Sequence, residues 1–253
     1  MAFMEFLRQN VLNTTTMITT TLNNGVGTFP YSYDRNLRLK YSTVGYSSNT
    51  TTDFTIKFQN TTPISHVLIQ NHNLKQFRVF MDGNTATVLG SAVTNNSATS
   101  TYISFATVQA AQITLLLEQP MIADNEKSFG EIVVADRLLV FERNPDVSNW
   151  TPTISRKQII HEMPDGGVKV YQIRDKFNAQ LSWGFVTNTF HDNLLTLYSS
   201  AMSMYFIPFP TTTSWSGEAY EISWIGDFDF NYGENSKTQG FNGSMNLRET
   251  AGG

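Results

Sequence analysis

Apolar and polar residues alternate with a period of two over most of this chain, which is the pattern of half-buried β-strands. The clearest run is 54–58, where phenylalanine and isoleucine alternate with threonine and lysine. Further strands are expected at 64–69, 77–80, 102–105, 113–117 and 137–141, with another strand-like run at 128–134. The Asp82-Gly83 pair that follows 77–80 predicts a turn, because its glycine tolerates positive φ. Short strands joined by polar loops predict an antiparallel sandwich.

The second half of the chain also alternates. Strands are expected at 168–173, after the Asp165-Gly-Gly turn, and at 205–209, 220–225, 228–230 and 241–247. The longest is 177–185, whose apolar residues share one face of the strand: Phe177, Ala179, Leu181, Trp183 and Phe185.

One helix interrupts this pattern. It is predicted to begin at Thr187 or Thr189, because apolar residues then recur with helical spacing, at Phe190, Leu194, Leu197 and Met202. Asp192 is expected in the first turn, where the helix dipole favours a negative charge.

The best domain boundary is Asn144-Pro145-Asp146, since Pro145 keeps the residue before it out of the helical conformation. Residues 1–30 are expected to form an arm, because their Thr- and Asn-rich stretch has few apolar anchors. Residues 31–145 then form a β-sandwich, and residues 150–250 form a second β-domain with one short helix. The predicted fold class is all-β.

The amino-acid composition excludes several classes of function. Charged residues make up only 15% of the chain, against roughly 25% in ordinary soluble domains, and threonine, asparagine and serine replace them. Large neutral polar surfaces of this kind often become subunit contacts. The net charge of −4 does not indicate a basic surface that would bind nucleic acid. There is no cysteine, which excludes disulfides and thiolate sites. Neither a signal peptide nor an apolar run long enough to span a membrane is visible.

No group of residues matches a catalytic or metal-binding template. The four histidines lack metal-ligand spacing and are assigned structural or surface roles: His66, His72, His161 and His191. Asp227 and Asp229 alternate with phenylalanines, so both carboxylates are expected on one side of a strand. Such a pair could bind a hard cation, but without a third oxygen ligand it is interpreted as a solvated face. We therefore expect no enzyme activity, no cofactor and no metal.

Large aromatic residues gather in the last third of the chain. Those expected at a subunit interface are Trp183, Phe206, Phe209, Trp215, Tyr220, Trp224 and Phe241. Trp215 lies in a Thr- and Ser-rich loop and is the residue most expected to be exposed. It is therefore also the one candidate for stacking against a sugar.

The order of motifs after residue 176 is distinctive. It consists of Lys-Phe-Asn-Ala-Gln-Leu-Ser-Trp at 176–183, Phe-Ile-Pro-Phe-Pro-Thr at 206–211, Tyr-Glu-Ile-Ser-Trp at 220–224 and Gly-Phe-Asn-Gly-Ser-Met-Asn-Leu-Arg-Glu-Thr at 240–250. This run resembles the C-terminal domain of minor tail and baseplate proteins of tailed bacteriophages. The resemblance implies a tail-tube or distal-tail fold that assembles as a ring at the tail tip.

The first half resembles galactose-binding-like, discoidin-type jelly rolls more weakly. The residues that carry this likeness are 31–37, the 54–58 strand, and 64–74 leading into 77–80. Phage tails often carry such modules as decoration or adaptor domains. No set of residues transfers as a sugar site.

Together these patterns and resemblances predict a structural virion protein, made in the host cytoplasm and located in the phage tail. Its expected partners are copies of itself in a ring and other tail proteins, with no nucleic acid. The alternative is a tail adaptor or a receptor-binding protein that contacts a host-surface glycan.

Overall fold

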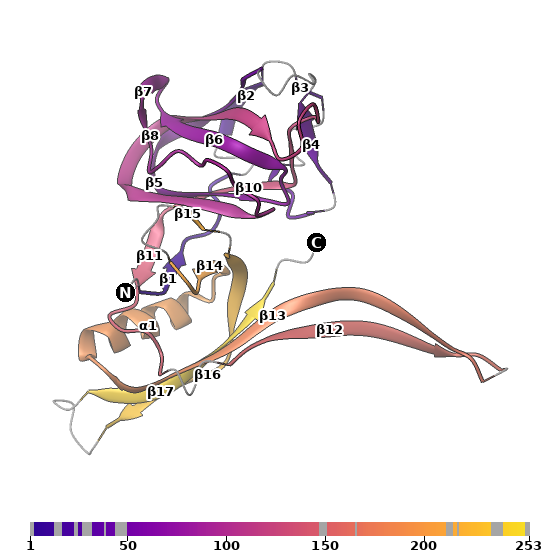
Figure 1. The fold of residues 1–253 in the computed structure, drawn as a ribbon. Coiled ribbons are helices and arrows are strands. Elements are labelled where there is room, and N and C mark those ends of the chain that lie inside the picture. Colours follow the sequence, from indigo (N-terminus) through magenta and orange to yellow (C-terminus); the bar gives the residue numbers. More distant parts are fainter. Residues whose placement is uncertain are drawn as a thin grey trace. The chain divides into compact units, whose positions relative to one another are not determined.

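The structure is a computed structural model that describes residues 3–12, 17–22, 25–26, 32–37, 39–43, 50–146, 151–164, 166–210, 215–216, 218–233 and 240–250. By its internal contacts the chain divides into two compact units. The N-terminal unit consists of Met1–Leu138 with Ile207–Ala219, and the C-terminal unit of Leu139–Phe206 with Tyr220–Gly253 (Figure 1). Both are built from antiparallel strands, so the expected all-β fold class with one short helix is confirmed. In the described part of the chain, no helix is long and apolar enough to cross a membrane.

The N-terminal unit is a β-sandwich. Its strands are β1 (Glu5–Leu7), β2 (Met17–Leu22), β3 (Gly25–Val26), β4 (Tyr41–Thr43), β5 (Thr52–Gln70), β6 (Leu74–Met81), β7 (Asn84–Val88), β8 (Thr101–Pro120), β9 (Ser128–Phe129), β10 (Glu131–Ala135) and β15 (Trp215–Ser216). One sheet has the order β10-β5-β8-β6-β7, with β2 paired to β5 and β15 paired to β8, and a smaller sheet has the order β3-β4-β9. β11 (Arg137–Val140) lies where the chain leaves this unit.

Side chains from both sheets form one core. Tyr41 of β4 and Phe129 of β9 stack with ring centroids 5.4 Å apart, and Phe54 of β5 meets Phe129 edge-on at 5.3 Å. The rest of this core comes from alternate residues of β5, β6 and β8, such as Ile56 and Leu115. Along 54–58 the period-two pattern thus places the apolar residues in the core as expected, whereas β10 and residues 64–69 of β5 are buried on both faces.

Two pairs of predicted strands are joined into single long ones. The runs 54–58 and 64–69 both belong to β5, and 102–105 and 113–117 both belong to β8. Between Lys57 and Thr62 the register of β5 against β8 shifts, and residues 59–61 are exposed whereas Phe58 stays in the core. A bulge lets a polar, proline-containing stretch remain within a strand.

The N-terminal residues are anchored in this unit, in contrast to the expected arm. The Asn10 side chain donates to the Ile132 carbonyl at 2.9 Å and accepts from the Val134 backbone N–H at 3.0 Å. Leu12 is buried in the core. Further along the predicted arm, β2 and β3 pair with β5 and β4.

The C-terminal unit is one antiparallel sheet carrying a helix. Its elements are β12 (Thr151–Glu162), β13 (Val168–Val186), α1 (Asn188–Ser200), β14 (Met204–Ile207), β16 (Tyr220–Tyr232) and β17 (Phe241–Glu249). The strands follow the order β14-β16-β17-β13-β12. The aromatic rings of Phe141, Trp183 and Phe190 pack together, with centroids 5.6 to 6.1 Å apart, and fill its core.

The helix begins as predicted. Thr187 is the N-cap, and its hydroxyl accepts a hydrogen bond from the Phe190 N–H at 3.2 Å. Phe190, Leu194 and Leu197 are its buried residues. Two details differ: Asp192 lies beyond the first turn, and Met202 lies past the last helical residue and is 40% exposed.

A bulge corrects the predicted face of β13. Phe177, Ala179, Leu181 and Trp183 are buried, but Phe185 is 43% exposed and Val186 is buried in its place. The register of β13 against β17 shifts between Trp183 and Val186, which moves later side chains to the opposite face.

β12 and β13 form a hairpin that continues past the sheet as a two-stranded ribbon (Figure 1). β17 pairs with β13 from Asn178 onward, so among the described residues, 156–162 and 168–175 have no strand partners other than each other. The turn at its tip is closed by Gly166 at φ +81° and by a 2.7 Å bond from the Met163 N–H to the Gly167 carbonyl. We call residues 156–175 the ribbon.

Candidate functional site

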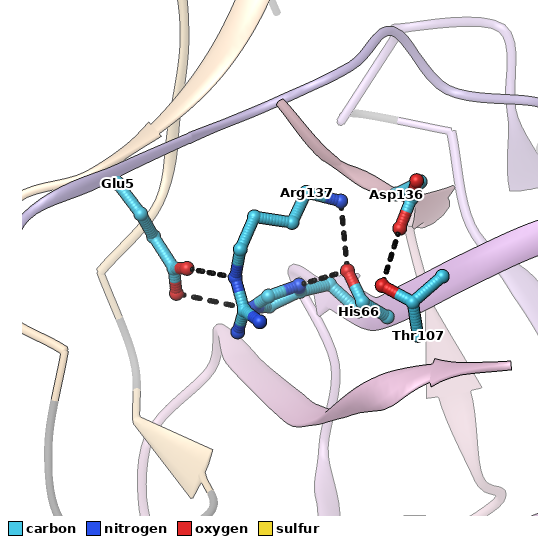
Figure 2. A network of polar contacts seen from close by, with 6 residues as sticks. Glu5, His66, Thr107, Asp136 and Arg137 are labelled. Atoms are coloured by element: carbon cyan, nitrogen blue, oxygen red, sulfur yellow. Dashed lines mark hydrogen bonds and ion pairs between the residues drawn. The ribbon is translucent and has the colours of Figure 1, made fainter. Parts of the chain in front are cut away.

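A buried polar network in the N-terminal unit joins β1, β5 and the start of β11, and Figure 2 shows it from close by. One oxygen of the Glu5 carboxylate lies 3.0 Å from Nε2 of His66, and the other accepts from Nε of Arg137 at 2.6 Å. Nδ1 of His66 lies 2.9 Å from the Ser65 hydroxyl, which accepts the Arg137 backbone N–H at 2.8 Å. Because the carboxylate can only accept, Nε2 of His66 donates to Glu5.

Serine, histidine and glutamate in contact are also the components of a hydrolytic triad, but this group is enclosed. Ser65 and His66 are fully buried and Glu5 is 5% exposed. Burial by itself raises the pKa of Glu5, whereas the hydrogen bonds and charges of His66 and Arg137 outweigh it and hold this pKa below its ordinary value. With the Ser65 hydroxyl buried, the contacts of this network fasten strand β1 to the sandwich.

His72 is a second buried histidine of the N-terminal unit. Its Nδ1 accepts from the Leu74 N–H at 3.0 Å, and Nε2 lies 3.0 Å from the Thr101 hydroxyl. Burial, helped by the charge of Lys40, lowers the pKa of His72 to about 4. The ring is therefore neutral at physiological pH and serves the fold.

This shift predicts a pH dependence of stability. His72 binds its proton near pH 6.5 when unfolded but only near pH 4 when folded, so its contribution is complete above pH 6.5 and is lost as the pH falls toward 4. The shift corresponds to about 3 kcal/mol. Urea denaturation of His72→Asn, which keeps an acceptor near the Leu74 N–H, should lack this loss between pH 6.5 and 4. An unchanged pH profile in that variant would contradict the assignment.

The C-terminal unit has a groove of about 410 Å³ where the end of α1 meets β16. It is lined by Leu197, Tyr198, Ser199, Ala201, Met202, Met204, Ser223, Trp224 and Gly226, none of them charged. The Tyr198 and Trp224 rings meet edge-on with centroids 5.3 Å apart. Nε1 of Trp224 is buried and has no hydrogen-bond partner among the described residues.

The ribbon carries many of the exposed apolar residues described in the C-terminal unit. Its exposed apolar residues are Ile159, Ile160, Met163, Val168, Val170 and Tyr171, each 46–63% accessible, and Ile154 at its base is 72% accessible. Ile160 pairs with Val170 across the ribbon, and Ile159 pairs with Tyr171. Neighbouring residues of a strand point to opposite faces, so the two pairs make both faces of the ribbon apolar.

The predicted interface aromatics have three different environments. Trp183, Phe206 and Phe241 are buried within the chain, so their contacts here are core contacts. Tyr220 and Trp224 are half-buried, and Tyr220 stacks on Phe177 with ring centroids 3.9 Å apart. Phe209 is 51% exposed. The side chain of Trp215, the candidate glycan contact, lies outside the described residues, although its backbone pairs with Ile103 of β8.

The remaining titratable candidates do not converge. His66 and His72 are buried in separate networks, His161 lies on the exposed ribbon, and His191 stacks on Phe241 with ring centroids 3.7 Å apart. Asp227 and Asp229 are both exposed. The described residues contain no group of three His, Cys, Asp or Glu side chains placed to hold a metal ion.

Sequence reasoning missed both the ribbon surface and the groove. A signal for the ribbon was available in the sequence. Ile159-Ile160 and Val168-Lys-Val170 place apolar residues on both strands of a hairpin. The groove had no comparable signal, because β16 contributes to it and is separated from α1 and β14 by a segment of the other unit.

Comparison with known proteins gives likeness of structure alone. No protein-family model and no curated protein matches the sequence. A chitosan-binding module from a chitosanase/glucanase of Paenibacillus sp. IK-5 is 10% identical over 51% of this chain and 98% of its own, with a TM-score of 0.42. A pectin-binding carbohydrate-binding module is 13% identical over 48% of this chain and 91% of its own, with a TM-score of 0.38. A Clostridium perfringens protein solved with GalNAc-β-1,3-galactose is 14% identical over 46% of this chain and 93% of its own, with a TM-score of 0.39. At these values no ligand is carried over to this chain.

Proposed function

We propose that this chain is a structural, non-enzymatic protein that assembles with copies of itself, as a ring or hub component of a bacteriophage tail tip or baseplate. It would be made in the host cytoplasm and act in the virion. The observation that supports assembly is the ribbon, which exposes apolar side chains on both faces. The tail setting rests on the sequence resemblance of residues 176–250.

An isolated two-stranded ribbon is at best marginally stable in water, because neither face is covered. Ile160 is 60% exposed and its cross-strand partner Val170 is 51% exposed. Exposed apolar surface of this kind marks protein interaction sites. At about 25 cal/mol per Å², covering it in an assembly would be favourable and would also order the ribbon.

Low charge supports the same function. Charged groups make up 15% of the chain, so large neutral surfaces can come together with little loss of ion hydration. The buried Ser65, His66 and Glu5 network fits a fold-supporting role rather than catalysis. Other tail proteins would be the further partners.

The test is the state of association of the purified chain. Analytical ultracentrifugation and electron microscopy are expected to show rings or other closed oligomers of the wild-type protein. Ile160→Lys should shift the midpoint concentration of assembly at least tenfold upward, because a buried lysine would lose its hydration. Ile122→Lys, at a 66% exposed position of the N-terminal unit, is the matched control and should assemble normally.

A wild-type chain that stays monomeric at every concentration would overturn the proposal, as would absence of the protein from the tails of imaged particles. Binding on a glycan array that is lost in Trp215→Ala would instead favour the receptor-binding alternative.

A further inference from the structure

We infer that the ribbon of one copy docks into the groove between α1 and β16 in the C-terminal unit of a second copy. This inference rests on the proposed assembly function and names its contact. The two surfaces are different parts of the same unit, so the contact is heterologous and each copy offers one of each.

The ribbon needs a concave partner. A flat surface would cover the Ile159–Tyr171 face and leave the Ile160–Val170 face in water, or the reverse. A groove encloses a ribbon from more than one side. The groove beside α1 has a volume of about 410 Å³, the size of a small-molecule pocket, so it would receive side chains from the tip of the ribbon.

The lining of the groove matches the tip of the ribbon chemically. Met202 and Met204 supply flexible apolar contacts that adapt to aliphatic side chains such as those of Val168 and Val170. The Trp224 N–H, buried and without a partner among the described residues, requires an acceptor. β12 is the edge strand of the sheet, so its outward carbonyl groups are acceptors that an incoming ribbon brings with it.

Charge also favours the C-terminal unit of a second copy. Residues 151–176 contain five lysines and arginines against three aspartates and glutamates, a net charge of +2. The rest of the C-terminal unit contains three lysines and arginines and eight aspartates and glutamates, a net charge of −5. The N-terminal unit contains nine basic and ten acidic residues, a net charge of −1. Exposed Asp227 directly follows Gly226 of the groove, so the acidic surface begins at its rim. Opposite charge steers the ribbon toward this unit.

The ribbon does not reach the groove of its own chain. β13 runs without interruption from the ribbon into the sheet, and the ribbon extends away from α1 and β16 (Figure 1). An intermolecular contact is therefore the one that satisfies both surfaces.

The absence of cysteine from the sequence allows a direct test by cross-linking. Val168→Cys places a thiol on the ribbon, at a 63% exposed position, and Met202→Cys places one in the groove, at a 40% exposed position. The two variants are mixed, treated with a short bismaleimide, and analysed by mass spectrometry. Ile122→Cys in place of Met202→Cys is the matched control.

We expect the 168–202 product to form at least ten times faster than the 168–122 product. Equal rates, in a protein that still assembles, would overturn the docking and leave the assembly function standing. A wild-type protein that never assembles would overturn both.

A second measurement tests the head-to-tail arrangement. Ile160→Lys weakens the ribbon contact and Met202→Lys weakens the groove contact, so neither variant alone should assemble at the concentration where the wild-type protein does. Their equimolar mixture should stop at dimers, because one intact ribbon and one intact groove remain. Normal assembly of Met202→Lys alone, or no dimer in the mixture, would contradict the inference.

Discussion

Replacing Glu5 by alanine is expected to lower the free energy of unfolding of the N-terminal unit by about 3 kcal/mol. The substitution removes the acceptor for both His66 and Arg137, whose bonds to Glu5 are 3.0 and 2.6 Å long. His66 is fully buried and would keep an unsatisfied N–H, whereas the Arg137 side chain is 35% exposed and can turn to water. Urea denaturation and hydrogen exchange at the β1 and β5 amides would measure the loss.

Asp136→Ala is the matched control. Asp136 is shown beside the network in Figure 2, and it accepts a 3.0 Å hydrogen bond from the exposed Thr107 hydroxyl. Because this bond is exposed, its loss should change the free energy of unfolding by less than about 1 kcal/mol. Similar losses in the two variants would show that burial does not set the strength of the network.

The Glu5 network also has its own pH window. The folded pKa of Glu5 lies below its ordinary value, so its stabilisation is complete above the unfolded pKa and is lost as the pH falls through the folded one. The loss of stability from Glu5 begins at a lower pH than the loss from His72. The Glu5→Ala and His72→Asn variants therefore separate the two effects.

Replacing Trp183 by alanine is expected to destabilise the C-terminal unit by about 4 kcal/mol. Trp183 is 2% exposed, its ring packs against Phe141, Phe190 and Phe230, and its indole N–H donates to the Arg143 carbonyl at 3.2 Å. The substitution would leave a cavity and an unpaired carbonyl. Hydrogen exchange at the β13 and β17 amides would locate the loss in this unit.

Ile225→Ala, at a 42% exposed position of the same unit, is the control and should cost less than about 1 kcal/mol. The experiment separates two roles for Trp183. A core residue changes stability first, whereas a residue acting only at a subunit interface would change assembly and leave the monomer's stability intact.

Periodicity located most strands and the helix because each depends on local spacing. The helix at 188–200 was visible from Phe190, Leu194 and Leu197, since a helix places those residues on one face without help from distant parts of the chain. The Asp82-Gly83 turn was visible for the same reason, and both residues have positive φ, at 51° and 73°.

Features set by pairing between strands were not predictable. Phe185 was placed on the same strand face as Trp183 because it continues an alternating series, but a register shift against β17 leaves it exposed. The stretch around Pro63 looked like a loop, yet β8 pairs with it as part of β5. In both cases the deciding partner is far away in the sequence.

The ribbon and the groove also differ in how far they could be predicted from the sequence. The ribbon could be inferred from two apolar-rich strands and a glycine turn, since a hairpin is a local structure. The groove depends on how α1, β14 and β16 come together, and Met202 and Trp224 are separated by a segment that belongs to the other unit.

That segment, Ile207–Ala219, affects how the protein can be made. The chain leaves the N-terminal unit after Leu138, returns to it for these residues, and leaves again, and β15 pairs with β8 only at this late point. On the ribosome, the sandwich would have to wait for most of the polypeptide to emerge before its last strand arrived. A gene fragment cut after residue 145 would encode a sandwich that lacks one of its strands, so the N-terminal unit is complete only in a piece that extends to Ala219.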